Sequence, residues 1–293
     1  MKLTINFKRT LAVCLAVILF ILSCAVQTNS TNAANTNVNY KVFNAQTGDY
    51  LRSYTLNSLR SENNSRAIID TDDREIDWSK SGTVKLMTIT GYIGTGFVVD
   101  EHTVATAGHC LYLYGTPWKV LEILLFDSTG KLAMTATPVE YHVPVNYINN
   151  NQDPETYNKT SDYGLITVKE DLSDYMCYNL GVISDPNHVV NKDINITGFP
   201  GDNNYFSKHT MLTASGSILN CSSEAIEYNA DTIPGDSGSP VYMTETRCGR
   251  TYNTVIGINA YTYEEANGTY HNYGTRIDTN ILHFFISNEN LLY

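Results

Sequence analysis

Short apolar runs separated by turn residues recur between residues 84 and 260, and they restrict the fold more than any other feature of this sequence. The runs cover residues 84–89, 96–99, 120–126, 132–139, 165–168, 194–199, 239–243 and 255–260. Their length, their richness in Val, Thr and Tyr and the absence of a long helical periodicity are typical of strands joined by turns. The sequence therefore predicts an all-β architecture of barrels or a sandwich.

One helix is expected near the C-terminus. Asp278 is placed to accept hydrogen bonds at the start of a helix that carries Ile281, Leu282, Phe284 and Phe285. Because these apolar residues recur at helical spacing, we expect them to pack on the body of the protein.

The first residues have the pattern of an export signal. Three basic residues among the first nine precede an apolar run over 11–22, and small and polar residues follow. This order is typical of a secretory signal peptide, which we place at residues 1–26. Because the run is shorter than the roughly 20 residues that a membrane-spanning helix needs, no stable membrane insertion is expected. A lipid anchor on Cys24 is the alternative, and a secreted, extracellular protein is the main prediction.

Residues 27–66 are interpreted as a linker followed by a pro-segment. The first part, 27–39, is rich in Asn, Thr and Ser and predicts a flexible connector without a core. We expect a cut after Arg66, which makes Ala67 the first residue of a mature domain over 67–293.

The charge balance bears on the partners. The chain has 30 acidic and 19 basic side chains and a formal net charge of −11. Phosphate binding demands a basic face, so nucleic acid is not expected as a partner. The acidic charge predicts a solvated, soluble extracellular surface, and a monomer is expected.

Six cysteines are present, and two of them, Cys14 and Cys24, belong to the export signal or lie beside it. Export permits disulfides, and four cysteines allow three pairings between which the sequence does not choose. Free buried thiols are the alternative. The four that remain are Cys110, Cys177, Cys221 and Cys248.

Three segments carry the residue types of a serine hydrolase. Hydrolysis by a serine needs an imidazole base, a carboxylate that orients it and amide donors for the oxyanion. His109 follows a strand-like run, Asp162 precedes another, and Ser237 lies in a glycine-flanked turn just before a third. Gly235 permits the turn in which its own amide and that of Ser237 face one point. The sequence thus predicts a nucleophile, a base, an orienting acid and an oxyanion hole.

Taken together, the segments TAGHC, SDYGLI and GDSGSP resemble the triad motifs of chymotrypsin-like proteases, and they occur in the same chain order. Further stretches over 103–110, 162–164, 198–202 and 273–277 resemble the bacterial glutamyl endopeptidases. The resemblance implies two six-stranded antiparallel β-barrels with an active site in the cleft between them. It also implies a serine endopeptidase that needs no metal and no organic cofactor.

The resemblance also suggests how the enzyme is activated. In the chymotrypsin clan a newly freed α-amino group pairs with the carboxylate just before the serine, which here is Asp236. A buried carboxylate without a partner is costly, so the site would stay malformed until the ammonium arrives. In glutamyl endopeptidases the new amino terminus instead helps to bind the substrate, and we expect only that the amine of Ala67 matters. The upstream acidic cluster lacks the spacing of a calcium loop and is interpreted as a solvated start; it comprises Asp70, Asp72 and Asp73.

The residue before the cut is predicted from four further positions. Thr232 matches a pocket threonine of the glutamyl endopeptidases, whereas Asn259 stands where that family has a pocket histidine. Asp231 stands where trypsin-like enzymes keep an aspartate for Lys or Arg. Arg276 is expected on the pocket floor, where it would neutralise Asp231 and bind a carboxylate, or on a solvated edge. We expect cleavage after Glu or Asp, with cleavage after Lys or Arg as the alternative.

Two other functions remain open at this stage. A protease fold that has lost catalysis would serve as a binding protein. A secreted hydrolase of esters or cell-wall peptides would use the same triad.

Overall fold

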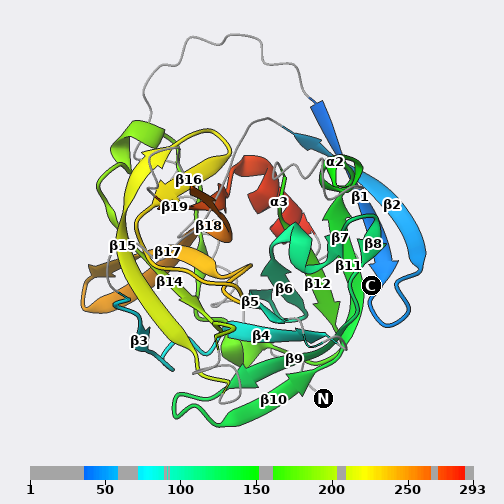
Figure 1. Cartoon of the computed structure of the whole chain (residues 1–293), viewed down its shortest axis with the longest axis horizontal. Helices are drawn as coiled ribbons and strands as arrows, with labels where there is room; N and C mark the ends of the chain where they lie inside the picture. Colours follow the sequence, from blue (N-terminus) through cyan, green and yellow to red (C-terminus); the bar gives the residue numbers. More distant parts are fainter. Residues whose placement is uncertain are drawn as a thin grey trace, which may run out of the picture. The chain divides into compact units, whose positions relative to one another are not determined.

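The computed structural model describes residues 36–58, 72–88, 91, 93–151, 161–202, 209–264 and 270–287. Strands dominate this part of the chain, which confirms the all-β prediction (Figure 1). The strands are β1 Thr36–Asn44, β2 Tyr50–Ser58, β3 Glu75–Ile76, β4 Thr83–Thr88, β5 Ile93–Asp100, β6 Thr103–Thr106, β7 Tyr112–Leu113, β8 Thr116–Pro117, β9 Val120–Phe126, β10 Leu132–Ala136, β11 Pro138–Pro144, β12 Gly164–Val168, β13 Asn179–Leu180, β14 Asp193–Gly198, β15 Leu212–Cys221, β16 Ala225–Tyr228, β17 Pro240–Arg247, β18 Arg250–Glu264 and β19 Tyr270–Arg276. The helices are η1 Gly108–Cys110, α2 Val145–Asn150, η3 Ser173–Tyr175, η4 Pro186–His188 and α3 Thr279–Ser287.

Each apolar run singled out in the sequence overlaps a strand. Residues 120–126 coincide with β9, and residues 132–139 divide between β10 and β11. Alternation explains why such runs are found from sequence, since one face of each strand is turned to a core. In β4, however, all but one of the residues are buried, because both of its faces are covered.

The first barrel is closed by a strand that bends at residue 137. Before the bend β10 pairs with β9, with Ala136 opposite Ile123. After the bend β11 pairs with β12, with Pro138 opposite Val168. The order β9, β4, β5, β6, β12 completes a ring of six antiparallel strands. One continuous stretch of chain thus supplies both ends of the ring and closes it.

The second barrel is a ring in the order β14, β15, β16, β19, β18, β17, and β17 returns to β14 with Ile196 opposite Val241. All pairings within this ring are antiparallel. Two short strands lie outside it: β3 adds to β15, and β13 pairs in parallel with β18 through Asn179 and Thr254. The predicted pair of six-stranded antiparallel barrels is therefore present, with short additions at the margins.

A hairpin of β1 and β2 extends the first barrel, and it corrects the sequence analysis. β1 pairs with β11 from Tyr40 opposite Pro144 to Asn44 opposite Glu140, so the hairpin lies beside the barrel in Figure 1. The connector predicted over 27–39 was expected to form no core, but its last four residues belong to β1 and Val38 is buried. The Asn- and Thr-rich composition misled the prediction because alternate residues of the strand still face the barrel.

Aromatic stacking attaches the hairpin to α3. The Tyr40 ring stacks on Phe284 with centroids 4.2 Å apart, and its hydroxyl lies 2.9 Å from that of Tyr163. Asp278 caps the helix, since its Oδ1 accepts the backbone N–H of Ile281 at 2.8 Å. The predicted C-terminal helix is confirmed, and its buried side chains are Ile281, Phe284 and Phe285.

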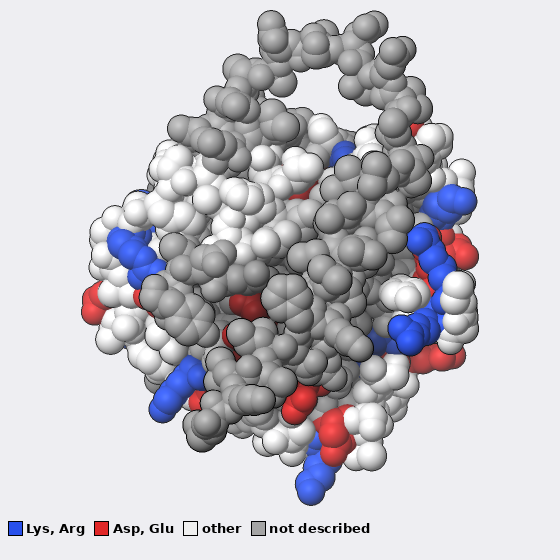
Figure 2. Space-filling view, turned by 180° about the vertical axis from the view of Figure 1, so that it is seen from behind, with Lys and Arg blue, Asp and Glu red and all other residues white. Residues whose placement is uncertain are grey.

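The surface shown in Figure 2 has scattered Lys and Arg side chains interspersed with Asp and Glu among the residues that are coloured. None of the helices within the described ranges is long and apolar enough to cross a bilayer. The four cysteines of the described chain are all free thiols, so the alternative of unpaired cysteines holds in this structure.

Candidate active site

His109 and Asp162 form a close pair in the first barrel. β6 ends just before η1, which carries His109, and β12 begins just after Asp162. The His109 Nδ1 lies 2.8 Å from Asp162 Oδ2, and the backbone N–H of His109 donates to Asp162 Oδ1 at 2.8 Å. One fully buried carboxylate therefore fixes both the ring and the backbone of the histidine.

This carboxylate sets the electrostatics of the imidazole. Burial by itself lowers the pKa of His109, but the negative charge of Asp162, with a smaller effect of Cys110, outweighs burial and raises the pKa above its ordinary value. The backbone of Asp162 is itself held in place, because its carbonyl accepts the hydroxyl of Thr275 from the second barrel at 3.0 Å. The pair has the arrangement that a general base and its orienting acid require.

Ser237 lies on the loop that enters β17, beside the histidine segment. Its backbone carbonyl accepts the N–H of Thr95 at 2.7 Å and the thiol of Cys110, the residue after His109, at 3.5 Å. Gly238 follows with a φ of +86°, which side chains rarely adopt, and a Cβ there would lie 2.1 Å from the Thr95 carbonyl oxygen. The sequence thus requires glycine here, so that the serine can approach β5 this closely.

Two hydrogen bonds orient the amides that were predicted to form the oxyanion hole. In a trans peptide the C=O and N–H point in opposite directions. The carbonyl of Pro234 accepts the N–H of Gly201 at 2.7 Å, so the N–H of Gly235 faces away from Gly201. The carbonyl of Asp236 accepts the side-chain amide of Asn259 at 2.6 Å, so the N–H of Ser237 faces away from Asn259.

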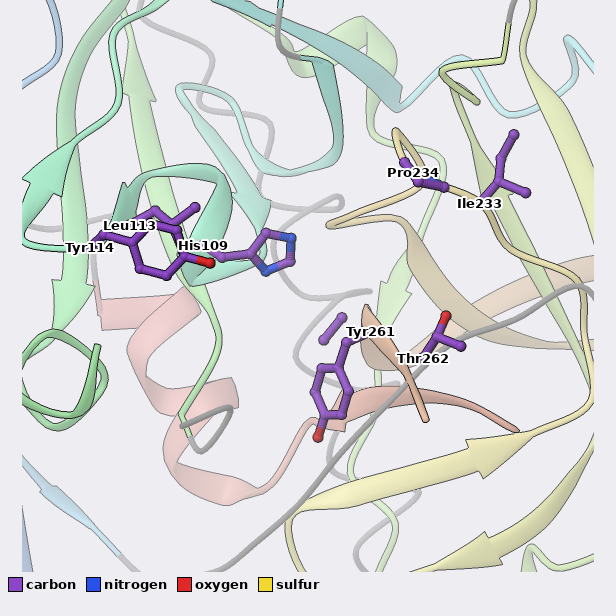
Figure 3. Close-up of a pocket in the computed structure, with 8 residues that line it drawn as sticks. His109, Leu113, Tyr114, Ile233, Pro234, Tyr261 and Thr262 are labelled. Carbon is purple, nitrogen blue, oxygen red and sulfur yellow. The ribbon is translucent and has the colours of Figure 1, made fainter. Parts of the chain in front are cut away.

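A cavity of about 320 Å³ is lined by His109 and by Ile233 and Pro234, which precede Gly235. In Figure 3 the His109 ring projects from the first barrel toward the loop that carries Ile233 and Pro234. Side chains of both barrels line it, so it occupies the cleft where the sequence analysis expected the active site. Its lining comprises His109, Leu113, Tyr114, Ile233, Pro234, Ala260, Tyr261 and Thr262.

The four residues expected in the substrate pocket take different roles in the structure. Asp231 and Thr232 are buried just before the serine loop, and the Thr232 hydroxyl has no hydrogen-bond partner within the described ranges. Asn259 is fully buried, and its Oδ1 accepts the hydroxyl of Tyr228 at 2.7 Å while its Nδ2 serves Asp236. Both ends of its amide are used inside the protein, so Asn259 supports the loop from behind.

Arg276 is directed to backbone carbonyls. Its Nη1 donates to the carbonyl of Ser222 at 2.7 Å and its Nη2 to that of Ile183. The residue is 7% exposed, which excludes the solvated edge that the sequence left open. No hydrogen bond or ion pair between Arg276 and Asp231 is found in the described structure.

Two residues that support the loop were missed by the sequence analysis. The Thr95 hydroxyl donates to the carbonyl of Gly235 at 2.8 Å, which fixes the loop against β5. Arg74 lies 3.8 Å from the carboxylate of Asp236 and binds Asp72, which was interpreted as part of a solvated start. Neither residue stands in a recognisable motif, and only the preceding acidic cluster hinted at a cation. The predicted cut between Arg66 and Ala67 lies outside the described residues.

Comparison with known families decides the class of this fold. Residues 94–257, which include the histidine, the aspartate and the serine, match the trypsin-like peptidase domain. The chain belongs to the trypsin-like peptidase family. The predicted kinship with chymotrypsin-like proteases is therefore confirmed.

Individual relatives have a more specific similarity to the chain. The chain is similar to the glutamyl endopeptidase of Bacillus licheniformis, with 28% identity over 195 residues that cover 62% of this chain and 55% of that protein. It is 27% identical over 176 residues to the glutamyl endopeptidase of Staphylococcus aureus strain MW2, covering 57% of this chain and 46% of that protein. An extracellular metalloprotease of Bacillus subtilis is 25% identical over 225 residues, covering 73% and 67%. The chain spans about half the length of the two glutamyl endopeptidases.

Solved structures show the same trypsin-like fold. A Glu endopeptidase in complex with MPD superposes with a TM-score of 0.61 and 19% identity over 77% of this chain and all of that one. An inactivated protease paralogue of the scabies mite superposes with a TM-score of 0.51 and 16% identity over 73% of this chain and 96% of that one. The fold is therefore shared by proteins with and without activity, and function must be argued from the site.

Proposed function

We propose that this chain is a secreted serine endopeptidase in which Ser237 is the nucleophile, His109 the general base and Asp162 its orienting acid. The observation that carries the proposal is the double clamp of Asp162 on the ring and backbone of His109, with the serine loop bonded to the next residue. A carboxylate at Nδ1 fixes the tautomer in which Nε2 can accept a proton. The inactive alternative is not favoured, because each chemical role has a residue in place.

The proposed reaction passes through an acyl-enzyme. Ser237 Oγ attacks the peptide carbonyl while His109 takes its proton, and the amides of Gly235 and Ser237 stabilise the oxyanion. His109 then protonates the leaving amine, and a water molecule, activated by the same imidazole, releases the acid product. No metal or cofactor takes part in these steps.

Active-site labelling tests this proposal. A fluorophosphonate should attach to wild-type protein at one serine, and Ser237→Ala should abolish both the labelling and peptide hydrolysis. Peptide hydrolysis that persists in the Ser237→Ala variant, or a wild-type protein that neither reacts nor cleaves, would refute the assignment.

We infer that cleavage follows Glu or Asp. The two glutamyl endopeptidases among the relatives support this specificity. The buried Thr232 hydroxyl also supports it, because an unused donor beside the serine loop can bond a substrate carboxylate.

Cleavage after Lys or Arg is the second candidate, and a specific observation favours it. Asp231 is buried just before the serine loop, at the position where trypsin-like enzymes keep an aspartate for Lys or Arg. Peptides that are identical except for Glu, Gln, Lys or Arg before the cut distinguish the two. A preference for Glu over Gln supports the first candidate, and a preference for Lys and Arg replaces it.

The proposal includes export, a pro-segment and a monomeric state. Residues 1–26 have the order of a signal peptide, and the net charge of −11 suits an extracellular protein. The dispersed basic side chains of Figure 2 offer no basic stripe on the described part of that face, which supports the absence of a nucleic-acid partner. Mass spectrometry of protein collected from a culture medium would identify the first residue of the exported form.

A further inference from the structure

The guanidinium of Arg74 lies among three aspartates that come from different segments of the chain. Its Nε and Nη2 donate to the two carboxylate oxygens of Asp72 at 2.8 Å each. Nη2 also lies 3.4 Å from Asp202, and Nη1 lies 3.8 Å from Asp236 Oδ2. β3 begins at the next residue and pairs with β15, so the backbone at Arg74 is fixed to the second barrel.

The contact with Asp236 is buried on both sides. The side chain of Arg74 is 4% exposed and that of Asp236 is 6% exposed. A charge removed from water in this way is strongly unfavourable unless an opposite charge lies close to it. Nη1 of Arg74 makes no hydrogen bond within the described ranges, so the ion pair with Asp236 is the contact that accounts for its position.

Asp236 connects Arg74 to the predicted oxyanion hole through two hydrogen bonds with Ile233. Its Oδ2 accepts the N–H of Ile233 at 3.0 Å, and its own N–H donates to the carbonyl of Ile233 at 3.0 Å. These two bonds close the turn that carries Gly235, and Ser237 follows directly. A displaced Asp236 carboxylate would therefore release the turn and the two amides.

Arg74 also supports the loop from its other side. Asp202 follows Gly201, whose N–H holds the carbonyl of Pro234 and so turns the N–H of Gly235 toward the opposite side. By bridging Asp202 and Asp236, a single guanidinium holds both chain segments on which the direction of that amide depends.

We propose that Arg74 is a positioning residue which supplies, from within the chain, the cation that trypsin-like zymogens obtain from a newly freed α-amino group. The turn that carries Gly235 and Ser237, which we call the oxyanion loop, then forms before the chain is cut upstream of residue 74. Such a cut is not needed to shape this loop. This inference rests on the proposed serine endopeptidase function.

A double-mutant cycle that removes the charges of Arg74 and Asp236 tests the role of Arg74. Arg74→Met removes the cation that lies 3.8 Å from the buried carboxylate of Asp236, so kcat should fall about 100-fold while KM changes less than about threefold. Arg74→Lys should retain much of the activity. The double variant Arg74→Met/Asp236→Asn should recover at least tenfold over Arg74→Met, because the buried negative charge is removed together with the cation. Arg247→Met, which removes an exposed ion pair with Glu245, is the matched control and should equal wild type.

The cycle separates positioning from general destabilisation. If the double variant is as slow as Arg74→Met, the loss stems from missing packing of the arginine, and the inference is wrong. If Arg74→Met keeps wild-type kcat, the inference is wrong as well, while the proposed function survives. A wild-type protein without hydrolysis or labelling overturns the proposed function itself.

An uncut chain provides the second test. Arg66→Gln in the full chain, with the intact mass verified, should react with a small fluorophosphonate at a rate within about threefold of that of the cut wild-type protein. A small probe does not require the pocket for the residue before the cut, so it reports on the serine and the oxyanion loop alone. Labelling more than about 100-fold slower in the uncut chain would show that a free amino terminus shapes the loop, and would overturn the inference.

Discussion

The hydroxyl pair of Tyr40 and Tyr163 offers a sharp test of the hairpin's contribution. Tyr40 is fully buried, and the two oxygens are 2.9 Å apart. Tyr40→Phe keeps the ring on Phe284 and removes only the hydroxyl. The Tyr163 hydroxyl is then left buried without this partner, which costs about 1–3 kcal/mol of the free energy of unfolding. For a domain of this size each kcal/mol lowers Tm by about 2–4 °C, so a drop of about 2–12 °C is expected.

Thermal and urea unfolding in the Ser237→Ala background measure this change without self-digestion. Tyr50→Phe is the matched control on the same hairpin, because the Tyr50 hydroxyl also makes a hydrogen bond, to Ser53 at 2.8 Å, but the residue is 55% exposed. The control should stay within about 0.5 kcal/mol of the parent. Equal stability of the two variants would show that the buried pair does not hold the hairpin on the barrel, and the reasoning would be refuted.

Three further predictions concern the site and the charges. Asp162 raises the pKa of His109, so kcat/KM should fall with decreasing pH around a midpoint above pH 6.5. Asp162→Asn should lower kcat about 10⁴-fold, and an unchanged kcat would contradict the orienting role of Asp162. Gly238→Ala places a Cβ 2.1 Å from the Thr95 carbonyl oxygen at a φ of +86°, so unfolding should become easier by more than about 3 kcal/mol and hydrolysis should be lost, as denaturant titration and an activity assay would reveal. Hydrogen bonds from His142 and Arg52 lower the pKa of Glu140 from its ordinary value to about 2, so its stabilising effect is complete above pH 4.5 and fades as the pH falls toward 2; Glu140→Gln should flatten the loss of stability across that window, and an unaltered slope would argue against the ion pair.

The sequence revealed the site wherever the local backbone enforces the residue type. Gly238 must be glycine because of its φ and its approach to β5, and that need is visible in the motif around Ser237. The strand before His109 and the strand after Asp162 could also be predicted, because the alternation of apolar and polar residues along a strand is a local property of the sequence. These features are encoded within a few residues of the groups that they place.

Contacts made across the fold were not visible. Arg276 was expected at the pocket floor, but its direction is fixed by the carbonyls of Ile183 and Ser222, which are distant in sequence. Arg74 stands in no motif, and its role arises only when β3 joins β15. Side-chain direction depends on the partners that the fold brings together, so residue type alone does not determine it.

The position of the hairpin has a practical consequence for making the protein. Residues 36–58 precede the predicted cut at Arg66, yet their strand is hydrogen-bonded to β11. A severed chain should therefore run as two fragments on a denaturing gel and as one particle in gel filtration. A protein expressed from Ala67 onward would have β11 as an unpaired edge strand that can pair with a second molecule, so it should aggregate. Adding residues 36–58 as a separate peptide should prevent this aggregation.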